Sequence, residues 1–197
     1  PATIGEIHVD ASRRDQRMRG FVERAKEAGA KLIASDDARL GALCGSSRHQ
    51  GVVARVTPIP RSNSLDDTLD AIEGPALLLV LDGVTDPHNL GACLRVADGA
   101  GAHAVVAPTD HAVGINATVA KVASGAAETV PYFMVTNLAR TLGELKERDI
   151  RVVGTSDDAA GSLYETDLAG PVALVLGAEG SGMRQLTARH CDELVRL

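Results

Sequence analysis

The feature that most constrains this chain is the regular alternation of short apolar runs with helical segments from residue 75 onward. The runs are apolar on both faces of each predicted strand, which is typical of parallel strands buried on both sides. Strands of this kind, alternating with helices, predict an α/β fold whose parallel sheet is covered by helices on both faces. We expect strands at 77–81, 104–107, 130–135, 150–154 and 172–176, and helices at 89–100, 117–127, 138–148 and 183–191.

The first 56 residues predict a separate small α/β domain. Its expected strands span 4–9, 31–34 and 51–56, and its expected helices span 13–28 and 36–43, the second capped by Ser35. Pro, Ser and Asn residues then punctuate a segment that predicts a linker, with a short helix at 65–72. We therefore expect a small domain at 1–56, a linker at 57–74 and a larger domain at 75–197.

The core must be aliphatic, because the 197 residues include no Trp, two Phe and two Tyr. So few aromatic side chains disfavour a protein that binds single strands by stacking on their bases. The longest apolar run, 76–81, is far shorter than the roughly 20 residues of a membrane span, and no signal peptide is evident. Three scattered cysteines and unclustered histidines predict neither a disulfide framework nor a metal site. We expect a cytoplasmic protein with no membrane partner.

The charge of the chain is unevenly distributed. The net charge is −6, composed of +4 over residues 1–61 and −10 over residues 62–197. Seven basic residues lie between positions 13 and 31, with acidic residues interspersed. This stretch is either a solvated helix face or a module that contacts phosphates beside an acidic catalytic domain. Charge alone leaves both interpretations open.

Ligands of open parallel sheets bind at the carboxyl ends of the strands, which directs attention to the loops after Leu81, Gly154 and Leu176. The first loop, 82–89, leads into a helix that carries Arg95. Asn89 lies near the expected start of that helix, where its amide can cap the helix or contact a ligand. The pair Asn89 and Arg95 is therefore either a helix cap with a surface arginine, or an anion or ribose site.

The second loop, 177–182, has three glycines with the spacing G-x-x-G-x-G. Glycines permit unusual backbone angles and close approach to a ligand. The spacing differs from the G-x-G-x-x-G of dinucleotide binding, and no phosphate-binding loop of the Walker type is present. Glu179 within this loop would repel a phosphate, so a positively charged sulfonium cofactor fits better than a nucleotide phosphate. A plain tight turn is the alternative.

The third loop, 155–158, carries two hydroxyls and two carboxylates in the order Thr-Ser-Asp-Asp. Hydroxyl groups at the end of a strand can bond an adenine or an amino-acid carboxylate. They also serve as helix caps, and we favour that structural role here.

Two of these loops resemble motifs of a known family. Residues 79–95 (LVLDGVTDPHNLGACLR) and 173–183 (ALVLGAEGSGM) are similar to the first and second motifs of the SpoU/TrmH class of SPOUT RNA methyltransferases. The resemblance continues through 121–128 and 135–140, and residues 49–56 resemble the end of that family's small RNA-binding domain. The resemblance covers nearly the whole chain. The sequence is most similar to the family members that methylate 23S ribosomal RNA.

The resemblance implies a fold and a reaction. The fold is a SPOUT domain with a deep trefoil knot, preceded by a small L30e-like RNA-binding domain. The reaction is 2′-O-methylation of a guanosine ribose in 23S ribosomal RNA with S-adenosylmethionine as methyl donor, carried out by a homodimer. Motif matching places Asn89, Arg95 and Glu179 at active-site positions. The cofactor positions are Thr155, Leu176, Gly177, Gly180 and Leu197.

The sequence departs from the family pattern at both ends. A third motif, rich in Ser, Leu and Asn, should follow Leu197, and the small domain lacks the opening strand and helix of the pattern. We expect the chain to be part of a longer protein.

Three functional alternatives remain. The first is an RNA-binding protein of the same fold that has lost catalysis, and the second is a related tRNA 2′-O-methyltransferase. The third, a nicotinamide-dependent oxidoreductase, is disfavoured by the glycine spacing. The role of Arg95 is also open. The resemblance makes it the base, but an arginine is almost never neutral in a protein, so it can instead clamp a phosphate and stabilise an alkoxide.

Overall fold

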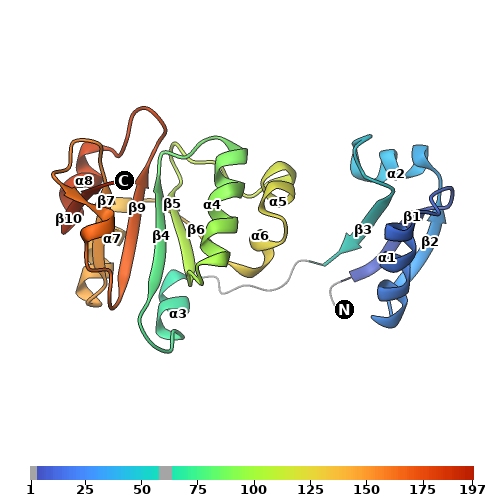
Figure 1. Ribbon diagram of the computed structural model, residues 1–197, viewed down its shortest axis with the longest axis horizontal. Coiled ribbons are helices and arrows are strands. Elements are labelled where there is room, and N and C mark those ends of the chain that lie inside the picture. Colours follow the sequence, from blue (N-terminus) through green and yellow to red (C-terminus); the bar gives the residue numbers. More distant parts are fainter. Residues whose placement is uncertain (1–3, 58–63) are drawn as a thin grey trace. The chain divides into compact units, whose positions relative to one another are not determined.

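The computed structural model describes residues 4–57 and 64–197, and the chain separates into two compact units at residues 1–60 and 61–197 (Figure 1). Each unit has a sheet of its own. Part of the predicted linker, 58–63, lies outside the described residues. The later part of the linker forms α3 (Leu65–Asp70), a short helix capped by the hydroxyl of Ser64.

The smaller unit is a mixed three-stranded sheet in the order β2-β1-β3, with two helices. Its strands pair in parallel between β1 and β2 and antiparallel between β1 and β3. A few apolar side chains, among them Ile7, Met18 and Leu40, form its core. The elements in chain order are β1 (Ile4–Asp10), α1 (Gln16–Glu27), β2 (Lys31–Ser35), α2 (Asp37–Cys44) and β3 (Val52–Val56).

The predicted cap of the second helix is wrong. Asp36 caps α2, because its carboxylate accepts a hydrogen bond from the backbone N–H of Arg39 at 2.8 Å. Ser35 is instead the last residue of β2, where its buried hydroxyl lies 3.0 Å from Nδ1 of His8. The first helix also begins later than predicted, since Asp15 caps it and Gln16 is its first residue.

The larger unit has the predicted parallel sheet. Every strand pairing recorded in it is parallel, and the strand order is β6-β5-β4-β9-β7-β10-β8. Strands β4 and β9 are therefore neighbours although they are far apart in sequence. The strands are β4 (Leu77–Asp82), β5 (Ala104–Pro108), β6 (Tyr132–Val135), β7 (Arg151–Thr155), β8 (Gly161–Ser162), β9 (Val172–Gly177) and β10 (Glu193–Arg196).

Helices cover both faces of this sheet (Figure 1). Alternate residues of β4 point to opposite faces, so Leu78 and Val80 join one cluster while Leu79 and Leu81 join the other. The helices, apart from α3, are α4 (Pro87–Gly99), α5 (Ala117–Ala123), α6 (Ala126–Thr129), α7 (Leu138–Glu147) and α8 (Gln185–His190).

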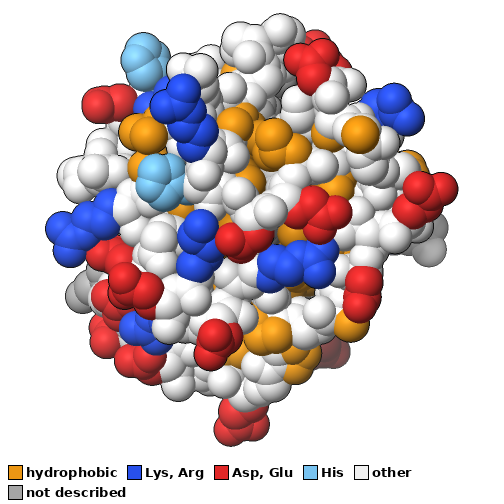
Figure 2. Space-filling model, turned by 90° about the vertical axis from the view of Figure 1, so that its left-hand side faces the viewer, with side chains coloured by type: hydrophobic (Ala, Val, Ile, Leu, Met, Phe, Trp, Pro, Cys, Tyr) orange, Lys and Arg blue, Asp and Glu red, His pale blue; other side chains and the backbone are white. Residues whose placement is uncertain are grey.

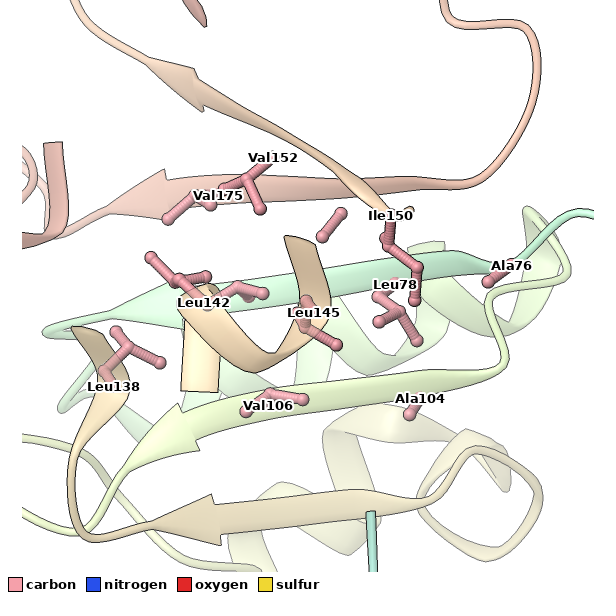
Figure 3. Packing of buried hydrophobic residues seen from close by; sticks show 12 residues of the cluster. Ala76, Leu78, Ala104, Val106, Leu138, Leu142, Leu145, Ile150, Val152 and Val175 are labelled. Atoms are coloured by element: carbon pink, nitrogen blue, oxygen red, sulfur yellow. The ribbon is translucent and has the colours of Figure 1, made fainter. Parts of the chain in front are cut away.

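One face of the sheet packs against α7. Leu138, Leu142 and Leu145 of this helix lie over the strands, and Leu142 and Leu145 are fully buried (Figure 3). Truncating a buried leucine of this kind to alanine costs about 2–5 kcal/mol, so this face is a main source of stability. The opposite face is covered by α4, α5 and α6.

Several predicted elements differ in the structure. The helix expected at 117–127 is two helices, because Ser124 and Gly125 adopt positive φ angles of 52° and 104° that end α5. The helix expected at 183–191 is reduced to α8, and the chain then forms β10, a strand that was not predicted. The short strand β8 and the 3-10 turn Leu163–Glu165 were not predicted either.

None of the helices in the described residues combines the length and the apolar character that crossing a membrane requires.

Candidate active site

A cavity of about 580 Å³ lies at the carboxyl ends of strands β7 and β9. Its volume is within the range of about 300–1,000 Å³ typical of small-molecule sites. Its position is also the one expected for a ligand of a parallel sheet. The cavity is lined by Thr155, Ser156, Asp157, Asp158, Gly177, Ala178, Glu179, Gly180, Ser181, Gly182, Met183, Ala188 and Leu197.

Seven consecutive residues of this lining, 177–183, form what we call the glycine loop. The loop closes on itself, because the backbone groups of Ala178 and Gly182 exchange hydrogen bonds of 3.0 and 2.9 Å. A Cβ atom on Gly177 would lie 2.2 Å from the carbonyl carbon of Gly182, so no side chain fits there. Gly180 and Gly182 have φ angles of 80° and 67°, which favour glycine. The glycines are thus required by the backbone path.

Four of the five predicted cofactor residues line this cavity, namely Thr155, Gly177, Gly180 and Leu197. The Thr155 hydroxyl donates a hydrogen bond to the carbonyl of Val175 at 3.2 Å. The fifth, Leu176, is not among the lining residues, and its side chain packs against the core cluster beneath α4. Ser156 accepts a hydrogen bond from the N–H of Asp158 at 3.3 Å, and both residues also line the cavity. None of the described helices begins in this loop, so the favoured capping role is wrong, and the loop lines the cavity instead.

The predicted active-site residues Asn89 and Glu179 lie side by side. The Asn89 amide nitrogen is 3.5 Å from Oε2 of Glu179, a long hydrogen bond between two exposed side chains. Glu179 also lines the cavity, so it connects the cavity to helix α4. Asn89 does not cap that helix, because Asp86 occupies the cap position and accepts from the N–H of His88 at 2.6 Å. That hydrogen bond from the backbone lowers the pKa of Asp86.

Arg95 lies on α4, two turns beyond the helix start, and is exposed. Within residues 4–57 and 64–197 it makes no ion pair or hydrogen bond. The structure therefore brings Asn89 and Glu179 together, whereas the guanidinium of Arg95 has no partner among the described residues. The helix itself is held tightly against α5, since a Cβ on Gly91 would lie 2.6 Å from Cβ of Val122.

An ion pair that the sequence did not reveal joins the buried carboxylate of Asp82 to Arg184. Oδ1 of Asp82 accepts from Nε of Arg184 at 2.7 Å, and Oδ2 accepts from the backbone N–H of the same residue at 2.9 Å. A carboxylate placed directly after a run of apolar strand residues was the only signal for it. The partner lies 102 positions away, beyond the reach of any spacing rule.

Two cysteines close to this region are poor nucleophiles. Burial raises the pKa of the Cys93 thiol. Burial, together with the nearby negative charge of Asp192, raises the pKa of Cys191 to about 11. Because the thiolate is the reactive form, neither side chain is suited to covalent catalysis at neutral pH. The described part of the chain contains no group of three or more His, Cys, Asp or Glu side chains placed to hold a metal ion.

Comparison with known proteins assigns a family profile to each unit. Residues 76–197 match the profile described as the SpoU rRNA methylase family. Residues 1–62 match the profile described as RNA 2′-O ribose methyltransferase substrate binding.

Curated relatives match over the whole chain. A protein from Ralstonia nicotianae named 23S rRNA (guanosine-2′-O-)-methyltransferase RlmB is 62% identical over 195 residues, covering 99% of this chain and 78% of the relative. A protein of the same name from Bordetella pertussis is 58% identical over 197 residues, covering 100% of this chain and 80% of the relative.

Solved structures share the fold. The SpoU methyltransferase AviRb from Streptomyces viridochromogenes, solved in complex with AdoMet, has a TM-score of 0.75 at 21% identity. The match covers 98% of this chain and 73% of that protein. A structure described as an RNA 2′-O ribose methyltransferase has a TM-score of 0.78 at 24% identity, covering 98% of this chain and 71% of the other.

Proposed function

The chain belongs to the SpoU rRNA methylase family, and we propose from this membership which of its residues carry out the family's reaction. The protein is an RNA 2′-O-ribose methyltransferase, and it methylates a guanosine of 23S ribosomal RNA. Neither the RNA binder without catalysis nor the tRNA enzyme gains support from any observation. Because the substrate is ribosomal RNA, we expect the protein to work in the cytoplasm.

The single observation that carries the proposed site is the shared position of Glu179. This residue lines the cavity and also contacts Asn89 on α4, so one side chain joins a small-molecule pocket to the helix with the predicted catalytic residues. Methyl transfer from a small cofactor to RNA requires the cofactor pocket to lie next to the residues that contact the ribose.

The cavity fits S-adenosylmethionine in size and charge. Its volume suits a molecule of this class, and the carboxylates of Asp157, Asp158 and Glu179 favour a positively charged ligand over a phosphate. The missing side chain of Gly177 lets the loop close on its own backbone, and that closure shapes this wall of the cavity. We propose that the glycine loop, Thr155 and Leu197 hold the cofactor. When bound, S-adenosylmethionine supplies an electrophilic methyl group on a positively charged sulfur.

We assign Arg95 an electrostatic role in this reaction. A ribose 2′-hydroxyl is a weak nucleophile, and negative charge develops on its oxygen as it attacks the methyl carbon and its proton passes to solvent water. A guanidinium is protonated in proteins, and Arg95 is exposed and free of acidic partners among the described residues, so its charge is available to RNA. Arg95 would hold a substrate phosphate and stabilise the developing alkoxide.

Asn89 and Glu179 would orient the ribose. The carboxylate of Glu179 accepts from the Asn89 amide, which leaves the amide oxygen free to accept from a ribose hydroxyl. Among the described residues Glu179 makes no hydrogen bond or ion pair with Arg95, and its hydrogen-bond partner is Asn89. Correct placement of the reacting groups can account for several kcal/mol of barrier reduction.

We propose that the smaller unit holds the RNA. It matches a substrate-binding profile, and exposed arginines lie on and just before its helix α1, at positions 14, 17, 19 and 24. These side chains make no ion pairs with described residues. The larger unit has an excess of acidic residues, so phosphate contacts must come mainly from elsewhere. We also propose that the protein works as a homodimer.

The test of this function is mass mapping of 2′-O-methylation on 23S ribosomal RNA from cells with and without the gene. One guanosine should lose its methyl group when the gene is deleted and regain it on complementation. An unchanged methylation map in the deleted strain would contradict the proposal.

A further inference from the structure

Asp82 is a fully buried carboxylate at the end of the interior strand β4, with a side-chain exposure of 0%. Burying a charge is costly unless hydrogen bonds satisfy it. Both of its oxygens are satisfied by one residue, since Arg184 donates from its side-chain Nε and from its backbone N–H. Two hydrogen bonds to one partner fix the position of that partner's backbone as well as its side chain.

Arg184 is the first residue after the glycine loop. The loop closes through its own backbone, between Ala178 and Gly182, so these hydrogen bonds set its shape but not its place in the unit. Among the described residues, the loop's side chains make one outside hydrogen bond, the long contact from Glu179 to Asn89. The end of the loop is therefore held at two neighbouring residues, because Met183 packs against a core cluster and the Arg184 backbone donates a hydrogen bond to Asp82.

The start of the first loop packs directly against the glycine loop. Gly83, which follows Asp82, has a φ of 94°, and a Cβ built on it would lie 3.1 Å from Cβ of Ala178. Residues 82 and 83 thus contact the glycine loop near its beginning, while Asp82 holds its end through Arg184. The same chain segment then continues into α4, which carries Asn89 and Arg95.

We infer that Asp82 and Arg184 are a pair of positioning residues that hold the glycine loop at the working distance from α4. The inference rests on the proposed function of the cavity. Neither residue touches the reacting atoms. Without the pair, the glycine loop keeps its internal hydrogen bonds but loses its register against Asn89, so cofactor binding and methyl transfer both suffer.

The test uses full-length protein with three variants, Asp82→Asn, Arg184→Gln and the double variant. Each single variant should raise the dissociation constant for S-adenosylmethionine about 10- to 100-fold, the range expected for losing a hydrogen bond to a charged group. The turnover number should fall as well. In the double variant, the amide introduced at position 82 can accept from the backbone N–H of residue 184 and donate to the new amide side chain there. The double variant should therefore regain most of the S-adenosylmethionine affinity and turnover that the single variants lose.

Arg151→Gln is the matched control, because Arg151 pairs with Glu193 at 2.9 Å at the opposite ends of the strands. It should leave affinity and turnover within about two-fold of the wild type. If Asp82→Asn fails to fold, Arg184→Gln still tests the pair, since its backbone donor remains. Single variants with wild-type affinity and turnover, or a double variant no better than the worse single one, would overturn the inference. A wild-type protein that binds no cofactor would instead refute the proposed function.

Discussion

Asn89 and Glu179 lie 90 positions apart in the chain, yet the amide nitrogen of one is 3.5 Å from a carboxylate oxygen of the other. Asn89 is on α4 and Glu179 is in the glycine loop, so the contact joins the first turn of the helix to the loop. It is the point where the cavity meets the helix that we assign to RNA.

The Asn89–Glu179 contact predicts that the two side chains act as one unit. Asn89→Ala and Glu179→Gln should each lower turnover by roughly 100-fold, because misplacing a reacting group has an effect of that size. The turnover of the double variant should be little lower than that of either single variant, because the effects of substituting two residues in contact are not additive. Single-turnover methylation assays would measure this, and losses that multiply in the double variant would contradict it.

Arg95 is where the mechanism is most exposed to test. Arg95→Ala should reduce turnover by orders of magnitude while S-adenosylmethionine affinity stays near normal, because the residue is not among those lining the cavity. Arg95→Lys separates the two roles, since a lysine can lose its proton but cannot reproduce the guanidinium fork.

If Arg95 is an electrostatic clamp, both variants should lose nearly all turnover and should also bind RNA more weakly. Substantial activity in the lysine variant that rises with pH would show a base at this position. An alanine variant that retains most of the wild-type rate would refute both roles.

Gly177→Ala should abolish cofactor binding. The added methyl group would lie 2.2 Å from the backbone carbon of Gly182, so the glycine loop must open to accommodate it. Gly143→Ala is the control, because a Cβ at that position of α7 meets nothing within 4 Å. The control should stabilise the protein by roughly 0.5–1 kcal/mol, as alanine does in a helix, with unchanged affinity. Calorimetric titration and thermal unfolding would measure the two effects.

The arginines of α1 predict that the RNA affinity of the protein depends on salt concentration. Replacing Arg17 and Arg24 with alanine should weaken RNA binding at low salt and reduce its salt dependence, because fewer counterions are released on binding. Cofactor affinity should stay unchanged. Arg151→Ala in the larger unit serves as a control for the lost charge. Wild-type RNA affinity and salt dependence in the α1 variant would mean that these arginines form only a solvated surface.

Exposed apolar side chains beside the cavity support a dimer. Leu186, Leu194 and Leu197 are 58%, 37% and 70% exposed, and Figure 2 shows apolar side chains among charged ones on the side of the molecule where α8 and β10 lie. Sedimentation at micromolar concentration should give twice the monomer mass. Leu186→Glu should shift the protein toward monomer and lower activity, and Leu43→Glu in the smaller unit should leave the sedimenting mass unchanged. A fully active wild-type monomer would refute the dimer.

The sheet was predictable because its strands are apolar on both faces, as β4 shows with Leu78 and Leu79 in opposite clusters. Strand β10 was missed for the converse reason. Only Val195 of its four residues is buried, so its sequence lacks the continuous apolar run of an interior strand. The break after α5 did have a local signal that the prediction overlooked, because Ser124 and Gly125 form a dipeptide typical of turns and Gly125 has a φ of 104°.

The site was predictable only in part. Local spacing offered Asn89 either as a cap or as a ligand contact, and the resemblance to a family decided between them. The cap turned out to be Asp86, which leaves the Asn89 amide free for Glu179. The pairing of Asp82 with Arg184 depends on β9 lying beside β4, and strand order is a property of the folded sheet that no local pattern contains.

The insertion of β9 between β4 and β7 also has a consequence for how the protein is made. Leu77 pairs with Val172, so one edge of β4 stays unpaired until a strand 95 residues later in the chain has been synthesised. At about 5–20 residues per second, the ribosome needs roughly 5–20 s to deliver it. During that interval the nascent chain exposes the unpaired backbone groups of a strand whose first five residues are apolar, the kind of edge that pairs with other chains. Synthesis rate and chaperone supply should therefore govern the yield of folded enzyme more strongly than the stability of the finished sheet does.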